Sequence, residues 1–565
     1  MKKIQQLFQK AVSENPRVLL DRETDWGVSK CFQSSLNDSS IPVLTRNTFR
    51  GAIPNGSVVR VVGMVQDIRD PELYGRVYEA RYEGKEDITY VQTQYTENPR
   101  FNGIQVNVQR PKSLAERVPL VICPIPGQSS WTMPQQQQSS TLAHTPRSTG
   151  DMAKKRRRVD DDDDSHKEQA PKRRTAGDLN ISPPAKDSSP SITSLPPIPG
   201  SVLVKVHVGK ERVGFKLNDI VEFVGVLSVN PESSACSEFE EDEDNFRSSP
   251  LHLPCVHSIV SRTRLSSMSL PNTQLMFTSS ARNDLKGMLM HRFGGDELAA
   301  EYAILHLVSR VHKRFTPTTP VGNLALCFSL HGSPWSSKPN SFVNMLSDIL
   351  RSIRPASKLL SLSNEFIGKS SWIPRKDYDS NRLISGELQV SNGTMLFVDQ
   401  TTLREGKIHG TAVSNLRSLQ DLVTQQTIPV DFKFYSTTLP VDVPVISVCT
   451  TNSMLKDFCT VPLRPQSLPS SSSVSNYDIQ NVRNYVEGVR WRIDLGVVAE
   501  SSGISPVLER GLCEARKRGI KLEQSDAHRW LTTATLLAKS HGVKYLSKAH
   551  LEQSIKMDMA RRARS

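Results

Sequence analysis

Two buried strands that each end in a polar residue constrain the fold of this chain more than any other feature. The first, Gly-Thr-Met-Leu-Phe-Val-Asp over 393–399, ends at Asp399, and the second, over 443–452, ends at Asn452. A polar, helix-compatible stretch separates them, and a further apolar strand is predicted at 321–330. Strands that alternate with helices in this way predict a layered α/β domain.

The polar strand ends raise the question of a nucleotide site. An AAA+ ATPase places its magnesium-binding Walker B aspartate and its sensor asparagine at the positions that Asp399 and Asn452 occupy. The second acidic residue of a Walker B motif is replaced here by Gln400. Because an amide cannot polarise an attacking water as a carboxylate does, the pattern keeps the strands and lacks the catalytic group.

A phosphate-binding loop is not predicted. Such a loop needs Gly-x-x-x-x-Gly-Lys-[Ser/Thr] directly after a buried strand, whereas 321–330 continues into His-Gly-Ser-Pro-Trp-Ser-Ser-Lys. Pro334 also removes one backbone donor from this loop. The tripeptide Gly-Lys-Ser at 368–370 matches the end of the motif, but no strong strand precedes it and it lies too close to Asp399.

We therefore interpret Asp399, Gln400 and Asn452 as remnants of a degenerate nucleotide site, in which Asp399 ends a strand or caps a helix. No catalytic residue, cofactor or metal ligand is predicted. The eight cysteines are scattered without a Cys-x-x-Cys pair, so neither a zinc site nor a disulfide framework is indicated.

The first half of the chain predicts a small β-barrel, because short β-branched runs there are punctuated by Gly and Asp-Pro. We expect an OB-like barrel built from 51–127 and 201–230, preceded by an N-terminal helical segment over 1–50. The two parts of the barrel are separated by 128–200, which is rich in Gln, Ser and Pro and has the composition of a disordered insertion.

The insertion carries two basic clusters that predict a nuclear localisation signal read by a nuclear import receptor. The residues concerned are Lys154, Lys155, Arg156, Arg157, Arg158, Lys172, Arg173 and Arg174. The alternative is a general polyanion-binding patch, which five adjacent aspartates at 160–164 disfavour because they repel nucleic acid. The same insertion offers Thr145, Ser182 and Ser189, each followed by proline, as candidate phosphorylation sites.

The remaining chain predicts two further domains. An acidic loop and linker (231–279) precedes an AAA+-like α/β domain without Walker A (280–465), and a Ser-rich linker (466–475) leads to a C-terminal helical domain (476–565) that forms a lid. A length of 565 residues suits two to four domains, and the net charge of +13 suits a nuclear or nucleic-acid-associated protein. No apolar run approaches the roughly 18 residues of a membrane span, so no membrane contact is expected.

Several segments carry a family resemblance. The strands at 393–400 and 443–452 resemble a mini-chromosome maintenance helicase subunit without its ATPase motifs. The segment Met-Val-Gln-Asp-Ile-Arg-Asp-Pro-Glu-Leu-Tyr-Gly-Arg-Val-Tyr-Glu at 64–79, together with 123–127, 376–378 and 381–389, resembles the mini-chromosome maintenance complex-binding protein family. This resemblance implies a nuclear, non-catalytic protein that binds helicase subunits and reaches chromatin through them. It also implies control of the assembly or unloading of their complex, and roles in sister-chromatid cohesion and cell-cycle progression.

Two alternatives are kept beside this interpretation. One is an active AAA+ ATPase that uses Lys369. The other is a single-stranded-DNA-binding protein whose barrel stacks bases on aromatic side chains flanked by cations. The candidates for that surface are Tyr74, Tyr78, Tyr82, Arg69, Arg76 and Arg81.

Overall fold

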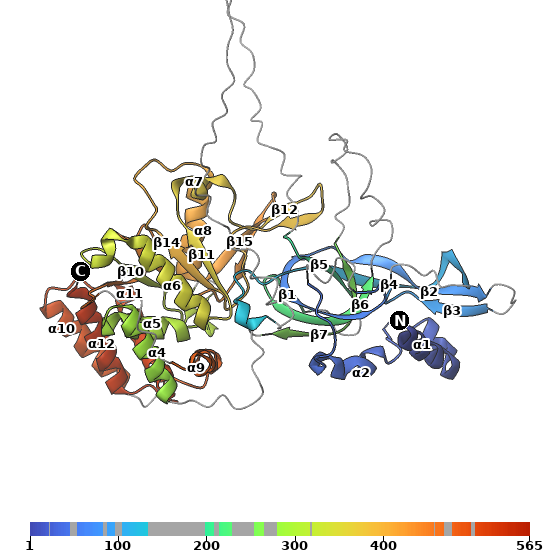
Figure 1. The fold of residues 1–565 in the computed structure, drawn as a ribbon, viewed down its shortest axis with the longest axis horizontal. Coiled ribbons are helices and arrows are strands. Elements are labelled where there is room, and N and C mark those ends of the chain that lie inside the picture. Colours follow the sequence, from blue (N-terminus) through green and yellow to red (C-terminus); the bar gives the residue numbers. More distant parts are fainter. Residues whose placement is uncertain are drawn as a thin grey trace, which may run out of the picture.

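The computed structural model shows mixed α and β architecture with several sheets, as the sequence predicts. It describes residues 1–21, 23–45, 53–82, 88–96, 104–133, 198–207, 214–228, 253–264, 279–316, 319–456, 458–467, 477–498 and 503–564. A β-rich lobe (blue to green) lies beside a lobe of strands and helices (yellow-green to red), and the two chain ends lie in different lobes (Figure 1).

The β-rich lobe is one sheet in the order β1-β6-β7-β5-β4-β2-β3 with an additional β1–β4 pairing, so the pairing returns from β4 to β1. Its strands are β1 (Val58–Ile68), β2 (Glu72–Tyr82), β3 (Ile88–Gln92), β4 (Ile104–Cys123), β5 (Val202–His207), β6 (Ile220–Ser228) and β7 (Cys255–Arg264). Gly63 permits the β1–β4 approach, because a Cβ at this position would overlap the Cys123 carbonyl. Strands from before and after 134–197 therefore share one hydrogen-bonded sheet.

The sequence analysis did not predict β7, whose residues lie in the range expected as acidic loop and linker. The first six residues of β7 are all buried, so this half of the strand has no alternation of polar and apolar residues to mark it. β7 pairs antiparallel with β6 and parallel with β5, and these pairings cannot be inferred from the order of the strands in the sequence.

The N-terminal segment covers part of this sheet. It contains α1 (Lys2–Glu14), η1 (Pro16–Leu19), α2 (Val28–Phe32) and η2 (Gln33–Asn37). The first helix buries Ile4 and Phe8, and the Phe8 ring meets the Trp26 ring edge-on at 4.8 Å. These side chains share a core with β6 and β7, which attaches the segment to the sheet.

The second lobe is organised around a parallel sheet in the order β11-β14-β17-β10-β18. Its strands are β10 (Leu326–Ser329), β11 (Ser357–Ser361), β14 (Met395–Asp399), β17 (Val445–Cys449) and β18 (Cys459–Pro462). Alternate residues face two separate cores: Phe397 packs in one, whereas Leu396 and Val398 pack in the other. The sheet is therefore the middle of three layers.

Helices form the two outer layers of this lobe (Figure 1). One core takes α4 (Ser279–Arg292), α5 (Glu297–Val308), α6 (Pro339–Ile353) and α9 (Ile479–Trp491), and the other takes α7 (Asn364–Lys369) and α8 (Thr411–Gln425). The C-terminal helices α10 (Ile504–Lys517), α11 (Gln524–Ser540) and α12 (Lys548–Arg562) pack around Trp530. Within the described residues, no helix is long and apolar enough to span a bilayer.

Two small sheets complete the lobe. One has the order β13-β12-β15-β16 and consists of β12 (Arg375–Asp377), β13 (Arg382–Ile384), β15 (Thr427–Asp431) and β16 (Ser436–Pro440). The other pairs β8 (Lys313–Arg314) with β9 (Pro320–Val321).

The two lobes are joined by buried hydrogen bonds. Gln66 on β1 donates to the Leu383 carbonyl at 2.6 Å, and the Leu383 amide donates to the Asp67 carboxylate at 3.2 Å. Burial raises the pKa of Asp67 above its usual value. At a second junction the Ser357 amide donates to the Gly127 carbonyl at 2.8 Å. Backbone groups take part in both junctions, so these hydrogen bonds define how the two lobes are placed against each other.

Candidate functional site

The candidate site is the edge at which the parallel strands β10, β14 and β17 end. These strands are neighbours in the sheet and run in the same direction, so their carboxyl ends meet at one edge. Open α/β sheets bind ligands at such an edge. Every residue of the three strands is buried, so the chemistry of this edge is set by the residues that end the strands and follow them.

Asp399 ends β14 with its carboxylate turned to the backbone that follows. Its Oδ1 accepts from the Thr401 amide at 2.9 Å and from the Thr401 hydroxyl at 2.7 Å, and the residue is only 3% exposed. This carboxylate stabilises the turn after β14, whereas the sequence analysis expected Asp399 to end a strand or cap a helix.

Gln400 ties the end of β14 to β17 and to the turn after it. Its amide nitrogen donates to the Ser447 hydroxyl at 2.7 Å and the Ser453 hydroxyl at 2.9 Å, and its carbonyl accepts from the Met454 amide at 2.9 Å. Both ends of the side chain are thus used in structure. Asn452 lies in the same turn and is exposed, so the structure brings all three predicted residues to one edge without directing them at a shared ligand.

The loop after β10 is closed on itself. It forms η6 (Pro334–Ser337), in which the amides of Ser333, Ser336 and Lys338 each donate to a carbonyl three residues earlier. A phosphate-binding loop must instead point such amides at the ligand. The tripeptide at 368–370 lies at the exposed end of α7, which begins shortly after β11 ends at Ser361, so a strand of the parallel sheet precedes it, contrary to the sequence expectation. The residues before the tripeptide form a helix, whereas a phosphate-binding motif needs a loop there.

Side chains from distant parts of the chain cover this loop. The Arg464 guanidinium donates to the His331 carbonyl at 3.0 Å and to the Arg564 carbonyl at 2.7 Å. Asp296, 2% exposed, caps α5 by accepting from the Ala299 amide at 3.1 Å, and it also binds the Arg564 guanidinium at 2.8 Å. Arg564 is therefore fastened to the edge at which the parallel strands end.

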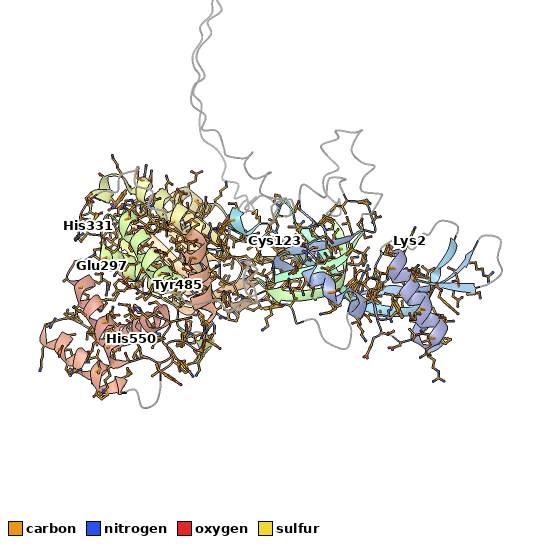
Figure 2. The ribbon with its side chains drawn as sticks, turned by 60° about the horizontal axis from the view of Figure 1, so that its bottom comes forward. Lys2, Cys123, Glu297, His331, Tyr485 and His550 are labelled. Carbon is orange, nitrogen blue, oxygen red and sulfur yellow. The ribbon has the colours of Figure 1, made fainter. Side chains whose placement is uncertain are left out.

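Sequence reasoning missed the link of Asp296, Arg464 and Arg564. An aspartate before an apolar helix is a recognisable N-cap, which is the one local signal for Asp296. His331 and Glu297 lie in the same part of the second lobe, far from Lys2 (Figure 2). Only the folded chain brings Arg564 to this place.

Two buried thiols lie in neighbouring strands of this sheet. The Cys327 and Cys449 sulfur atoms are 3.6 Å apart. Their thiol contact, together with burial, raises the pKa of Cys327 well above its usual value. Cys327 is therefore protonated at neutral pH and lacks the thiolate that a nucleophile requires.

The aromatic and basic residues predicted as a base-stacking surface on β2 are largely used in packing. The Tyr74 hydroxyl bonds to His207 at 3.1 Å, and burial raises the pKa of Tyr74. Arg76 is 1% exposed and lies over the Trp26 ring at 4.3 Å. Of this set, Arg81 is exposed and Tyr78 is half-buried, whereas the side chain of Tyr82 lies outside the description.

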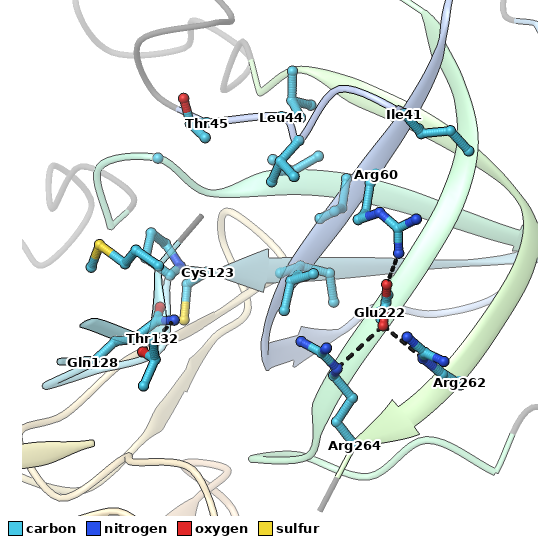
Figure 3. Close-up of a pocket in the computed structure, with 18 of the residues that line it drawn as sticks. Ile41, Leu44, Thr45, Arg60, Cys123, Gln128, Thr132, Glu222, Arg262 and Arg264 are labelled. Atoms are coloured by element: carbon cyan, nitrogen blue, oxygen red, sulfur yellow. Dashed lines mark hydrogen bonds and ion pairs between the residues drawn. The ribbon is translucent and has the colours of Figure 1, made fainter. Parts of the chain in front are cut away.

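A pocket of about 570 Å³ opens on the β-rich lobe and contains a charged cluster (Figure 3). Glu222 is 1% exposed and pairs with Arg60, with Arg262 at 2.7 Å and with Arg264 at 3.2 Å. Arg60 and Arg262 also donate to the Leu36 carbonyl. These bonds hold η2 against the sheet, so the cluster has a structural role.

The predicted localisation signal and the Ser/Thr-Pro sites lie in 134–197, outside the described residues. The acidic run at 238–244 and the Ser-rich linker residues 470–475 also lie outside them. Those predictions stand on the sequence.

Comparison with known proteins identifies the family. The family model described as mini-chromosome maintenance replisome factor matches residues 28–565. The mini-chromosome maintenance complex-binding protein of Gallus gallus is 29% identical over 100% of this chain and 94% of its own length. Proteins with the same name from Arabidopsis thaliana and Homo sapiens are 28% and 27% identical, each over 96% of this chain and 94% of its own length. The chain belongs to the mini-chromosome maintenance replisome factor family.

Proposed function

We propose that this chain is a non-catalytic nuclear regulator of DNA replication that binds mini-chromosome maintenance helicase subunits. In this role it controls the assembly of their complex or its unloading from chromatin, and thereby contributes to sister-chromatid cohesion and cell-cycle progression. The family relationship supports the helicase subunits as partners, because the relatives are named for binding that complex.

The proposal includes a resemblance to a helicase subunit. The strand order β11-β14-β17-β10-β18 supports an AAA+-like α/β unit. In it β10, the first strand of this sheet in sequence, lies between β17 and β18, the last two. The ring of pairings through β1, β6, β7, β5 and β4, in which β5 and β7 run parallel, supports an OB-like barrel. The helices after 476 supply a C-terminal lid. A protein of this shape can present subunit-like surfaces to the helicase.

One observation carries the non-catalytic part. The loop after β10 donates its amides to its own carbonyls, while Arg464 and Arg564 are fastened over the same edge. Gln400 stands where a catalytic carboxylate is needed, and its amide is used by Ser447 and Ser453. The groups at the edge that corresponds to the ATP site of a helicase subunit are therefore used in hydrogen bonds within the chain.

Nuclear residence is part of the proposal and rests on the basic clusters of the insertion. Replacing Lys154, Lys155, Arg156, Arg157 and Arg158 with glutamine is expected to move a fluorescent fusion to the cytoplasm. Serine substitution of the aspartates at 160–164 is the matched control, because it leaves the cations in place. Unchanged nuclear residence of the glutamine variant would refute the assignment.

The partner assignment is tested by pull-down from nuclear extract with identification of bound proteins by mass. We expect helicase subunits to be recovered, and recovery of none would overturn the proposed function. The competing ATPase function predicts hydrolysis that is lost in Lys369→Ala. We expect no hydrolysis above background for either protein.

A further inference from the structure

The strand β16 has an open backbone edge. Within the described part of the chain, β16 pairs with β15 alone and forms the outer strand of its sheet. The register is fixed by the Phe432 amide, which donates to the Tyr435 carbonyl, and by the Val441 amide, which donates to Gln426. Because antiparallel hydrogen bonds alternate along a strand, the amides and carbonyls of Ser436 and Thr438 point away from β15.

This edge carries little of the protection that proteins usually give to an outer strand. Charged side chains, prolines or bulges normally block such edges, because an open edge can pair with another chain. The five side chains of β16 are Ser, Thr, Thr, Leu and Pro, and its only proline, Pro440, stands at the end. Ser436 and Thr438 are both exposed, so a further strand has access to their backbone groups.

The turn that leads into β16 displays aromatic side chains to solvent. We call Phe432, Lys433, Phe434 and Tyr435 the aromatic turn. Phe434 is 77% exposed and Tyr435 59%, and the Phe434 ring meets that of Tyr378 from the β12–β13 turn at 5.4 Å. Exposed aromatic side chains next to one another are typical of protein interfaces, where they often dominate binding energy.

The backbone of the aromatic turn is held in a strained conformation. Lys433 has φ +64°, a region that non-glycine residues rarely adopt. The Asp431 carboxylate accepts from the Lys433 amide at 2.7 Å and stabilises this conformation. The Phe432 ring, from the start of the turn, stacks on the Tyr435 ring, from its end, with the ring centroids 5.0 Å apart. A turn built in this way presents the Phe434 side chain in a defined position.

Charge distinguishes a peptide from a nucleic acid as the occupant. Lys433 is exposed and has no ion-pair partner among the described residues, so its ammonium group can form an ion pair with one carboxylate of a ligand. Nearby Arg375 is paired with Asp431 at 3.7 Å, and Asp377 and Asp379 add negative charge on the neighbouring turn. Nucleic-acid binding relies on several cations, whereas the aromatic turn itself contributes one, Lys433.

We propose that the β16 edge and the aromatic turn together bind an extended segment of a helicase subunit. The segment adds to β16 as a further strand, packs apolar side chains on Phe434 and Tyr435, and places a carboxylate beside Lys433. The identity of the partner rests on the proposed function, whereas the extended conformation and the side-chain chemistry follow from the edge itself.

The test measures the affinity of purified full-length protein for each purified helicase subunit by biolayer interferometry. Thr438→Pro removes the outward amide and leaves the β15 pairing intact, because that amide does not bond to β15. Phe434→Ala removes the exposed ring by an independent change. The matched controls are Thr438→Val, which keeps the amide, and Phe315→Ala, which removes a ring that is 70% exposed at the β8–β9 turn.

We expect Thr438→Pro and Phe434→Ala each to weaken subunit binding by at least about tenfold, with both controls within about twofold of wild type. Wild-type affinity in both edge variants would overturn the docking surface while the proposed function stands. Failure of the wild-type protein to bind any subunit would overturn the proposed function as well. A single-stranded oligonucleotide serves as a further ligand, and loss of its binding in Phe434→Ala with unchanged subunit affinity would also overturn the proposal.

Discussion

The link between Asp296 and the C-terminal residues provides the sharpest stability prediction. Asp296 makes three kinds of contact: it caps α5 through Ala299, accepts from the Arg464 amide at 2.8 Å, and binds the Arg564 guanidinium. Asp296→Ala removes all three. Asp296→Asn keeps a capping oxygen and removes the charge, so the pair of variants separates the two contributions.

The expected magnitudes follow from the contacts. Loss of an N-cap costs about 0.5–2 kcal/mol, and loss of a hydrogen bond to a charged group costs about 1.5–3 kcal/mol when the partner stays buried. The Arg564 side chain is 23% exposed, so water compensates part of its lost contact. We therefore expect Asp296→Ala to destabilise the second lobe by roughly 3 kcal/mol and Asp296→Asn by roughly 1 kcal/mol.

Thermal unfolding followed by circular dichroism measures this difference. A loss of roughly 3 kcal/mol corresponds to a Tm lower by roughly 6–10 °C in a unit of this size. Hydrogen exchange at the end of α12 is expected to rise in Asp296→Ala, because the Arg564 contact holds that end on the sheet. A Tm for Asp296→Ala within about 1 °C of wild type would refute the reasoning, as would equal effects of the two variants.

Two further perturbations test the core and the junction between the lobes. Burial lowers the pKa of His306 to about 4, so the folded state keeps this ring neutral while the unfolded chain binds a proton below its ordinary value of 6.5. The free energy of unfolding is therefore expected to fall by about 1.4 kcal/mol per pH unit as pH falls from about 6.5 to 4. Urea unfolding of His306→Gln is expected to show a flatter dependence on pH over that range than the wild type. The same slope in the variant and the wild type would contradict this. At the junction, Gly127 has φ +70°, and a Cβ there would lie 2.5 Å from the Ser357 carbonyl oxygen. Gly127→Ala is therefore expected to lower the free energy of unfolding by more than about 2 kcal/mol and to speed proteolysis between the lobes. Gly214→Ala is the control, because no atom of the described residues beyond its chain neighbours lies within 4 Å of an added Cβ there, and equal proteolysis of the two variants would contradict the role of Gly127.

The parts of the candidate site that lie next to one another in sequence were predictable. Asp399 and Gln400 follow an apolar strand directly, and the change from apolar to polar residues marks the end of that strand. The chemistry of Gln400 is also evident from sequence, because an amide cannot replace a carboxylate as a base. These predictions depend only on local pattern.

The parts that depend on distant contacts were not predictable. Arg564 is 268 positions from Asp296, and its pairing gives no periodic signal in the sequence. The aromatic turn was also missed, because Phe434 and Tyr435 resemble core residues until the sheet places them at an exposed turn. Tyr74 and Arg76 suggested a nucleic-acid surface for the converse reason, since their burial depends on packing against His207 and Trp26.

The most direct test of the central claim is size-exclusion chromatography with light scattering on the purified full-length chain mixed with helicase subunits. The measurement is made with and without Mg-ATP, and phosphate release is recorded from the chain alone. We predict a complex of defined mass that contains a helicase subunit, and no phosphate release by the chain. Separate elution of the chain from every subunit, or ATP hydrolysis that is lost in Lys369→Ala, would contradict the account.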